Sequence, residues 1–215
     1  MTITYPLAVD VFADKLNIAS LKARPGHQQE LSGMGSGALL AADVAPALRE
    51  FDVTCNPMYH DDAAEVLALI EALGGSIGTF YLYDPRHTAP KADPGGSILG
   101  SSTVTISSLN ANNKAMKLTG LPSGYVLTAG DMLAWDYSTD PVRRACHRVI
   151  ETVTADSGGT SPEFEVRDFI RPGSTTGTAV TLIKPAMKCV MVPKSLSDDA
   201  DGMFTTIGFS VRQVI

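Results

Sequence analysis

The chain lacks the features that mark a nucleic-acid-binding protein or a membrane protein. Lys and Arg number 17 against 23 Asp and Glu, which gives a formal net charge of −6. Because an acidic surface repels the phosphate backbone, we expect no sequence-specific nucleic-acid binding. No apolar run approaches the roughly 20 residues that a helix needs to cross a bilayer, so we expect no membrane span.

Cysteine is scarce, and its three occurrences are widely spaced: Cys55, Cys146 and Cys189. None of them forms a C-x-x-C pair, so the sequence predicts neither a zinc knuckle nor a disulfide framework. We expect three small apolar side chains in a reducing compartment. The first residues also lack the basic start and apolar run of a signal peptide, which predicts synthesis and folding in the cytosol.

Motifs of catalysis and cofactor binding are missing as well. There is no Ser-His-Asp set, recognisable carboxylate pair or phosphate loop, so we expect no enzymatic activity and no cofactor. Residues 33–38 match the dinucleotide pattern G-x-G-x-x-A only loosely, because no strand precedes them, and residues 32–37 are predicted to be a mobile loop. His60-Asp61-Asp62 has no second ligand cluster, so we predict no metal site.

In the first half, alternation of apolar and polar residues predicts strands at residues 7–11, 16–23, 49–55 and 79–83. One helix is predicted between the last two of these strands. Asp62 and Glu65 would form a capping box at its start, and Gly74-Gly75 would end it in the left-handed conformation. Its apolar stripe is expected to cover one face of a sheet; the stripe consists of Val66, Leu67, Leu69, Ile70 and Leu73.

The second half contains a series of short strand patterns separated by turn signals. After a predicted linker at residues 86–102, these strands are expected at residues 103–106, 115–118, 132–135, 145–153, 164–169 and 179–183. Their regular spacing predicts a small antiparallel β-barrel or sandwich. An exit strand follows at residues 187–192, then an acidic turn at residues 198–202, and a terminal strand at residues 204–214.

The terminal strand needs a partner, and the first half has strands to spare. We therefore predict a mainly β (α+β) protein of two domains. Residues 1–92 and 187–215 would form a β-sandwich domain covered by one helix. Residues 96–186 would form the inserted antiparallel barrel, and residues 204–214 would pair with the N-terminal strands.

Two pairs of residues in the barrel suggest chemistry. Cys146 and His147 are neighbours on a strand and point to opposite faces, so they cannot form a thiolate-imidazole pair. His147 is therefore interpreted as a wall residue that is hydrogen-bonded to the backbone. Trp135 and Tyr137 share a strand face and are a candidate sugar-stacking pair, although such a pair belongs more often to a core.

Two segments together resemble the distal tail proteins of long-tailed phages and related gene transfer agents. The first segment is the strand–helix–strand unit from Phe51 to Pro85, which ends in Phe80-Tyr81-Leu82-Tyr83-Asp84-Pro85. The second segment is the barrel, whose short motifs are Ala129-Gly130-Asp131, His147-Arg148-Val149, Ala155-Asp156-Ser157-Gly158, Ile170-Arg171-Pro172, Gly177 and Pro185-Ala186-Met187. The order of these short motifs carries the resemblance, and residues 26–46 match nothing in it.

The resemblance implies a structural virion protein of the phage tail tip, made in the host cytoplasm. A belt domain would form a homo-oligomeric ring, usually of six copies, between the tail tube protein and the tail hub protein. A barrel of oligonucleotide/oligosaccharide-binding (OB) type would hang outward, and DNA would pass through the lumen. We expect Asp198, Asp199 and Asp201 to form an acidic loop facing that lumen, where carboxylates repel the duplex.

A reading from a different class is a carbohydrate-binding module. In that case the barrel would hold host-surface polysaccharide through Trp135, Tyr137 and Tyr125. The two readings are compatible, since a tail-tip protein can carry such a barrel. A small esterase would need a nucleophile that the sequence does not offer.

Overall fold

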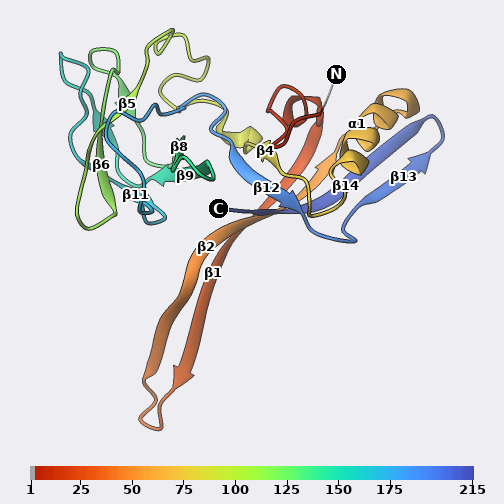
Figure 1. The fold of residues 1–215 in the computed structure, drawn as a ribbon, viewed down its shortest axis with the longest axis horizontal. Helices are drawn as coiled ribbons and strands as arrows, with labels where there is room; N and C mark the ends of the chain where they lie inside the picture. The colour runs from red at the N-terminus through yellow and green to blue at the C-terminus, as the bar shows by residue number, and fades with distance from the viewer. Residues whose placement is uncertain (1–2) are drawn as a thin grey trace. The chain divides into compact units, whose positions relative to one another are not determined.

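The computed structural model describes residues 3–215, and it is a mainly β protein with a single α-helix (Figure 1). Strands account for 43% of the residues and helical segments for 9%, which confirms the predicted α+β class. Among the described residues, no helix is long and apolar enough to cross a bilayer.

Internal contacts divide the chain into two compact units. Of the described residues, unit 1 contains 3–14, Phe80–Lys188 and Ile215, and unit 2 contains Lys15–Thr79 and Cys189–Val214. The predicted division instead placed residues 1–92 with 187–215. Residues before Asp14 join unit 1 because Leu7 bridges Phe80 and the Phe12 ring packs edge-on against the Phe80 ring, with centroids 4.9 Å apart.

The centre of unit 2 is an antiparallel sheet in which β1 (Ile18–Gly33), β2 (Leu39–Cys55), β14 (Phe204–Gln213) and β12 (Met187–Met191) are neighbours in that order. The terminal strand β14 pairs with β2, as the sequence predicts. Two short strands, β3 (Met58–Tyr59) and β13 (Ser197–Asp201), pair with the first half of β14.

Helix α1 (His60–Ala72) lies against β14 and buries Ala63, Val66 and Ile70. Gly74 and Gly75 follow it at φ +59° and +73°, which confirms the predicted left-handed ending. The predicted capping box is wrong, because the helix begins two residues before Asp62 and its N-cap, Tyr59, makes no side-chain cap hydrogen bond. Asp62 lies in the first turn, where a carboxylate is favoured by the helix dipole.

The far part of the β1–β2 hairpin, residues 26–48, extends beyond the other strands of unit 2 (Figure 1). We call it the arm. β14 pairs with β2 only from Glu50 to Thr54, so the arm has two strands and no third. Eight residues from Gly26 to Gly33 span about 24 Å at the usual rise of a strand. The predicted mobile loop at residues 32–37 is the tip of this hairpin, and the predicted strand at residues 16–23 is the beginning of β1.

Unit 1 contains a five-stranded sheet that curls into a half-barrel. Its order is β5 (Thr105–Leu109), β6 (Ala115–Thr119), β11 (Phe164–Arg167), β9 (Arg143–Val149) and β8 (Met132–Tyr137). A separate ladder joins β7 (Val126–Leu127) to β10 (Val153–Thr154).

Residues 177–181 connect the two edges of the half-barrel. The backbone of Ile106 in β5 bonds to Gly177 and Thr178, while Ala134 in β8 exchanges two hydrogen bonds with Thr181, at 2.7 and 3.0 Å. The predicted strand at residues 179–183 is therefore present only as isolated bridges. A single apolar cluster fills the interior; its largest members include Trp135, Phe164, Met116 and Leu118.

The remainder of unit 1 differs from the expected strand and linker. Leu7 makes only an isolated bridge, and residues 9–12 form turns that lead into the 3-10 helix η1 (Ala13–Lys15), so the predicted strand at residues 7–11 is wrong. After β4 (Phe80–Leu82) and η2 (Pro85–His87), the predicted linker is packed against the half-barrel. Asp93 in that segment is buried and accepts the backbone N–H groups of Ile98 and Leu99, and Leu99 joins the apolar cluster.

Candidate assembly surface

The candidate glycan contacts, Trp135 and Tyr137, lie in the core of unit 1, and this corrects the expectation. Their side chains are 0% and 4% exposed, and Tyr125 is buried in the same cluster. The Trp135 indole stacks on the His147 ring with centroids 4.6 Å apart and donates to the Ser174 hydroxyl at 3.0 Å. A buried ring presents no face to a sugar, so neither side chain supports glycan binding.

His147 has the structural role expected of it. Its Nδ1 lies 2.9 Å from the carbonyl oxygen of Asp168, so this contact is to the backbone. The three cysteines are free and buried. Burial raises the pKa of the Cys55 thiol to about 11, so it is protonated near neutral pH and unreactive as a nucleophile.

Buried or partly buried carboxylates in unit 1 hold backbone and side-chain donors. Burial alone would raise the pKa of Asp93, but the N–H groups of Leu99 and Ile98 outweigh it and lower that pKa. Asp131 likewise accepts the backbone N–H groups of Lys91 and Thr128 at 2.9 and 2.7 Å. These carboxylates are engaged in fixing loops and are not free to act as acids or bases on a substrate.

Unit 2 contains a cavity of about 350 Å³ on one side of its sheet. Its charged side chains neutralise one another. Arg24 pairs with Asp52, Arg212 Nε lies 3.4 Å from Glu50, and the Ser210 hydroxyl donates to Asp52 at 2.7 Å. Such cross-strand pairs stabilise a solvated sheet face and leave no unpaired charge for a ligand.

In His60-Asp61-Asp62, where the sequence predicts no metal site, the imidazole has structural contacts. His60 Nε2 donates to the carbonyl oxygen of Gly202 at 3.1 Å, since a carbonyl can only accept, and His60 Nδ1 lies 2.8 Å from the Thr205 hydroxyl. Across residues 3–215, no group of three His, Cys, Asp or Glu side chains is placed to hold a metal ion.

The acidic residues Asp198, Asp199 and Asp201 do not form a loop, and this expectation is corrected. They belong to the edge strand β13, whose five residues are all exposed. Pairing with β14 holds the three residues in an extended strand, and the turn itself consists of Gly202 and Met203. In the part of the chain that the structure describes, none of the three carboxylates takes part in a salt bridge; the pairs are Lys15–Glu65, Arg24–Asp52, Arg86–Asp84, Arg144–Asp136, Lys184–Asp14 and Arg212–Glu50.

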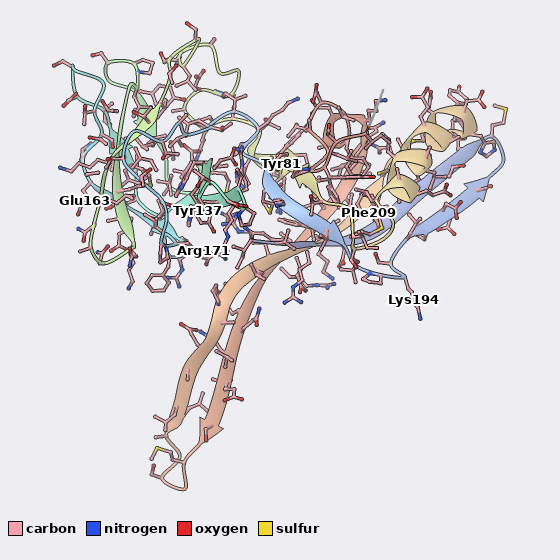
Figure 2. All side chains as sticks on the ribbon, viewed as in Figure 1. Tyr81, Tyr137, Glu163, Arg171, Lys194 and Phe209 are labelled. Atoms are coloured by element: carbon pink, nitrogen blue, oxygen red, sulfur yellow. The ribbon has the colours of Figure 1, made fainter. Side chains whose placement is uncertain are left out.

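The arm is the most unusual surface of unit 2, and the sequence patterns did not reveal it. Its exposed apolar side chains are between 50% and 65% accessible; they are Leu31, Met34, Leu39, Leu40 and Val44. Its side chains project to both sides, with no other segment of unit 2 covering them (Figure 2).

The register of the arm shows that both of its faces are apolar. Gln29 lies opposite Asp43 and donates to it at 2.7 Å, so this pair marks one face. Because strand side chains alternate, Leu31 and Leu39 share that face, while Leu40 lies on the other. A strand that is apolar on both sides is typical of a sheet covered on both sides. The run Leu39-Leu40-Ala41-Ala42 was the available signal.

Comparison with known proteins adds no relative from which a role could be transferred. The chain matches no protein-family model and no curated protein sequence.

Proposed function

We propose that this chain is a structural protein of a phage tail tip that assembles into a closed ring. In this proposal the ring, of about six copies as in the family that the sequence resembles, joins the tail tube protein to the tail hub protein and lets DNA pass. The order of motifs in the sequence supports the family, and the arm supports the self-assembly.

The arm is the single observation that carries the proposal. A two-stranded ribbon is at best marginally stable in water, and a ribbon with apolar side chains on both faces is also prone to aggregate. A protein that keeps such a ribbon needs a partner surface to cover it. A second copy is always present at the same concentration, and a head-to-tail ring gives every arm one acceptor.

The apolar side chains of the arm supply a large part of the free energy that such an association needs. Burying one Leu, Val or Met side chain contributes about 1.5–3 kcal/mol. The five exposed side chains together therefore offer on the order of 10 kcal/mol before the entropic cost of association. Only the part of this gain that exceeds the entropic cost appears as affinity, so other contacts of the interface have to add to it.

The test is the oligomeric state of the full chain, measured by analytical ultracentrifugation and by electron microscopy of negatively stained particles. The wild-type chain is expected to form closed rings. Leu39→Asp and Leu40→Asp each place a charge on one face of the arm, and each is expected to reduce assembly by at least tenfold in dissociation constant.

Ile77→Asp provides the matched control, because Ile77 is the most exposed large apolar side chain of unit 2 outside the arm, at 88%. This variant is expected to assemble like the wild type. A wild-type chain that stays monomeric at high concentration, or rings that persist in both arm variants, would contradict the proposal.

The carbohydrate-binding alternative loses the residues on which it depended. Trp135 and Tyr137 are packed inside unit 1, and no other aromatic pair of the half-barrel was implicated by the sequence. Binding of a host polysaccharide by the full chain, abolished by a substitution on the surface of unit 1, would restore that alternative. We also propose that the chain is not an enzyme, in line with the structural engagement of Asp93 and Asp131.

A further inference from the structure

Strand β13 has a free edge that faces away from β14. Within residues 3–215, β14 is its one pairing partner. Asp201 and Phe204 flank the two-residue turn Gly202-Met203, so they exchange both of their backbone hydrogen bonds. The intervening residues Asp198 and Ala200 therefore direct their N–H and C=O groups to the outer edge, where another strand can pair with them.

An aromatic pair lies on the same sheet face as Asp201, one and two strands in from this edge. Phe204 is placed between Asp201 on β13 and Tyr59 on β3, so the three side chains form one row across three strands. The Phe204 and Tyr59 rings are 5.1 Å apart between centroids, and they are 41% and 58% exposed. Exposed aromatic rings beside carboxylates attract Lys and Arg, because the ring face and the carboxylate both favour a cation.

The surface is held in shape before any partner binds. The His60 ring spans the β13–β14 hairpin through its contacts with Gly202 and Thr205, at 3.1 and 2.8 Å. A preorganised hairpin loses little conformational entropy when a strand is added to it. The free edge, the aromatic pair and the rigid turn are three separate features of one surface.

From this geometry we propose that β13 accepts an extended, lysine- or arginine-bearing segment of a different protein as an added β-strand. Backbone hydrogen bonds from Asp198 and Ala200 would supply affinity. Asp199 and Asp201 would select cationic side chains at alternate positions of the incoming strand, and the one beside Asp201 would reach toward the Phe204 ring, which Tyr59 supports from the next strand.

A second copy of this chain is a poor occupant of the same edge. Its own β13 would bring three more carboxylates, and its arm contains Glu30 and Asp43 but no Lys or Arg. Inward or edge charges of one sign are a known device against self-pairing of strands. The carboxylates thus exclude identical copies while admitting a basic strand, which makes the site independent of the proposed ring.

The probe is a fluorescein-labelled peptide of alternating lysine and valine, nine residues long, titrated against the full-length protein by fluorescence anisotropy. Saturable binding is expected, weakened about tenfold or more by the combined substitution Asp198→Asn, Asp199→Asn and Asp201→Asn. The matched control removes three other exposed carboxylates, in Glu30→Gln, Asp62→Asn and Glu71→Gln, and is expected to change binding less than about threefold.

Peptide variants separate strand addition from simple charge attraction without altering the protein. Two N-methylated versions of the probe each block one edge of the peptide, and one of them is expected to lose binding. A peptide with its lysines in one block keeps the charge but loses the alternation, and it is expected to bind at least about fivefold more weakly. The proposal is overturned if the probe does not bind, if both N-methylated versions bind fully, or if the block peptide binds equally well. Carboxylates that act only through their charge, as in a lumen that repels DNA, would give the second and third of these results.

Discussion

The half-barrel of unit 1 buries its large apolar side chains, whereas the arm of unit 2 exposes them. In unit 1, Trp135 and Phe164 are fully enclosed, and residues 177–181 bond to both edge strands of the half-barrel. In the arm, Leu39 and Leu40 lie on opposite faces and both are exposed. The half-barrel buries its apolar side chains within one chain. The arm has the composition of a sheet that is covered on both faces, but its apolar side chains are exposed. Exposure of this kind is the basis on which we propose that the arm is an interface.

The strongest test of this contrast compares a core substitution with an arm substitution. Phe164→Ala should lower the free energy of unfolding by about 3–5 kcal/mol, because it leaves a cavity in a filled interior. Leu39→Ala should change it by less than about 0.5 kcal/mol in the monomer, because that side chain is already in water. Urea denaturation followed by circular dichroism measures both values. Equal losses of unfolding free energy in the two variants would contradict the difference between the buried core and the exposed arm.

A cysteine placed on the arm should report its accessibility directly. At pH 8, Cys55 with a pKa of about 11 is about one part in a thousand thiolate. An exposed cysteine has a pKa of about 8.5, so a much larger fraction of it is the reactive thiolate. In Ala42→Cys, residue 42 should therefore react with a thiol reagent at least about a hundredfold faster than Cys55. Peptide mass spectrometry identifies the labelled site.

The same variant also sharpens the comparison between the free and the assembled chain. Ala42 lies opposite Glu30 on the face that also carries Leu40. At concentrations where rings form, labelling of residue 42 should slow markedly, while labelling of a fully denatured sample should reach all four cysteines. Unchanged labelling in the assembled state would mean that this face of the arm stays uncovered.

The base of the arm is expected to be sensitive to a single methyl group. A Cβ at Gly26 would lie 1.9 Å from the carbonyl oxygen of Leu48, so Gly26→Ala must push the two strands apart. We expect a local loss of about 1–3 kcal/mol, seen as faster hydrogen exchange of the arm amides. Gly33→Ala is the control, since a Cβ there meets no atom within 4 Å, and it should leave exchange nearly unchanged.

The smallest expected effect concerns pH and lies in unit 1. The Lys184 ammonium donates to Asp14 at 2.6 and 2.7 Å and is the main cause that lowers the pKa of Asp14, with help from the Tyr83 hydroxyl. The unfolded chain takes up a proton near the usual value of 3.8, whereas the folded chain does so only at lower pH. The stabilisation is thus complete above that value and is lost as pH falls through the folded pKa.

Asp14→Asn should remove this contribution, which we expect to be below about 1 kcal/mol because the pair is partly exposed. The measurement is the free energy of unfolding between pH 5 and 2 for both proteins, whose curves should converge at the acidic end. Parallel curves would show that the Asp14–Lys184 pair contributes nothing to stability.

The sequence predicted those elements whose signals are local. The alternation through Phe51, Val53 and Cys55 corresponds to the end of β2, and Gly74-Gly75 ends α1 as expected. The pairing of β14 with β2 was also predicted, because a terminal strand without a neighbour needs one. In each case a few adjacent residues, or a simple requirement for pairing, were sufficient.

Elements that depend on distant partners were missed. The arm does not alternate, because β2 is apolar on both faces there, so the rule that one face is polar could not detect a strand. Asp198, Asp199 and Asp201 have low strand propensity, and the register with β14 makes them a strand. Trp135 and Tyr137 do share a face, but which face of a curled sheet turns inward depends on the whole sheet.

The buried indole of unit 1 provides a fluorescence reporter whose emission does not respond to changes at the arm. Trp135 is the sole tryptophan of the chain, so all tryptophan emission comes from the interior of the half-barrel. Its emission maximum should stay in the blue when rings form or dissociate and should shift to the red only when the half-barrel melts. One cuvette can therefore distinguish a dispersed but intact chain from an unfolded one.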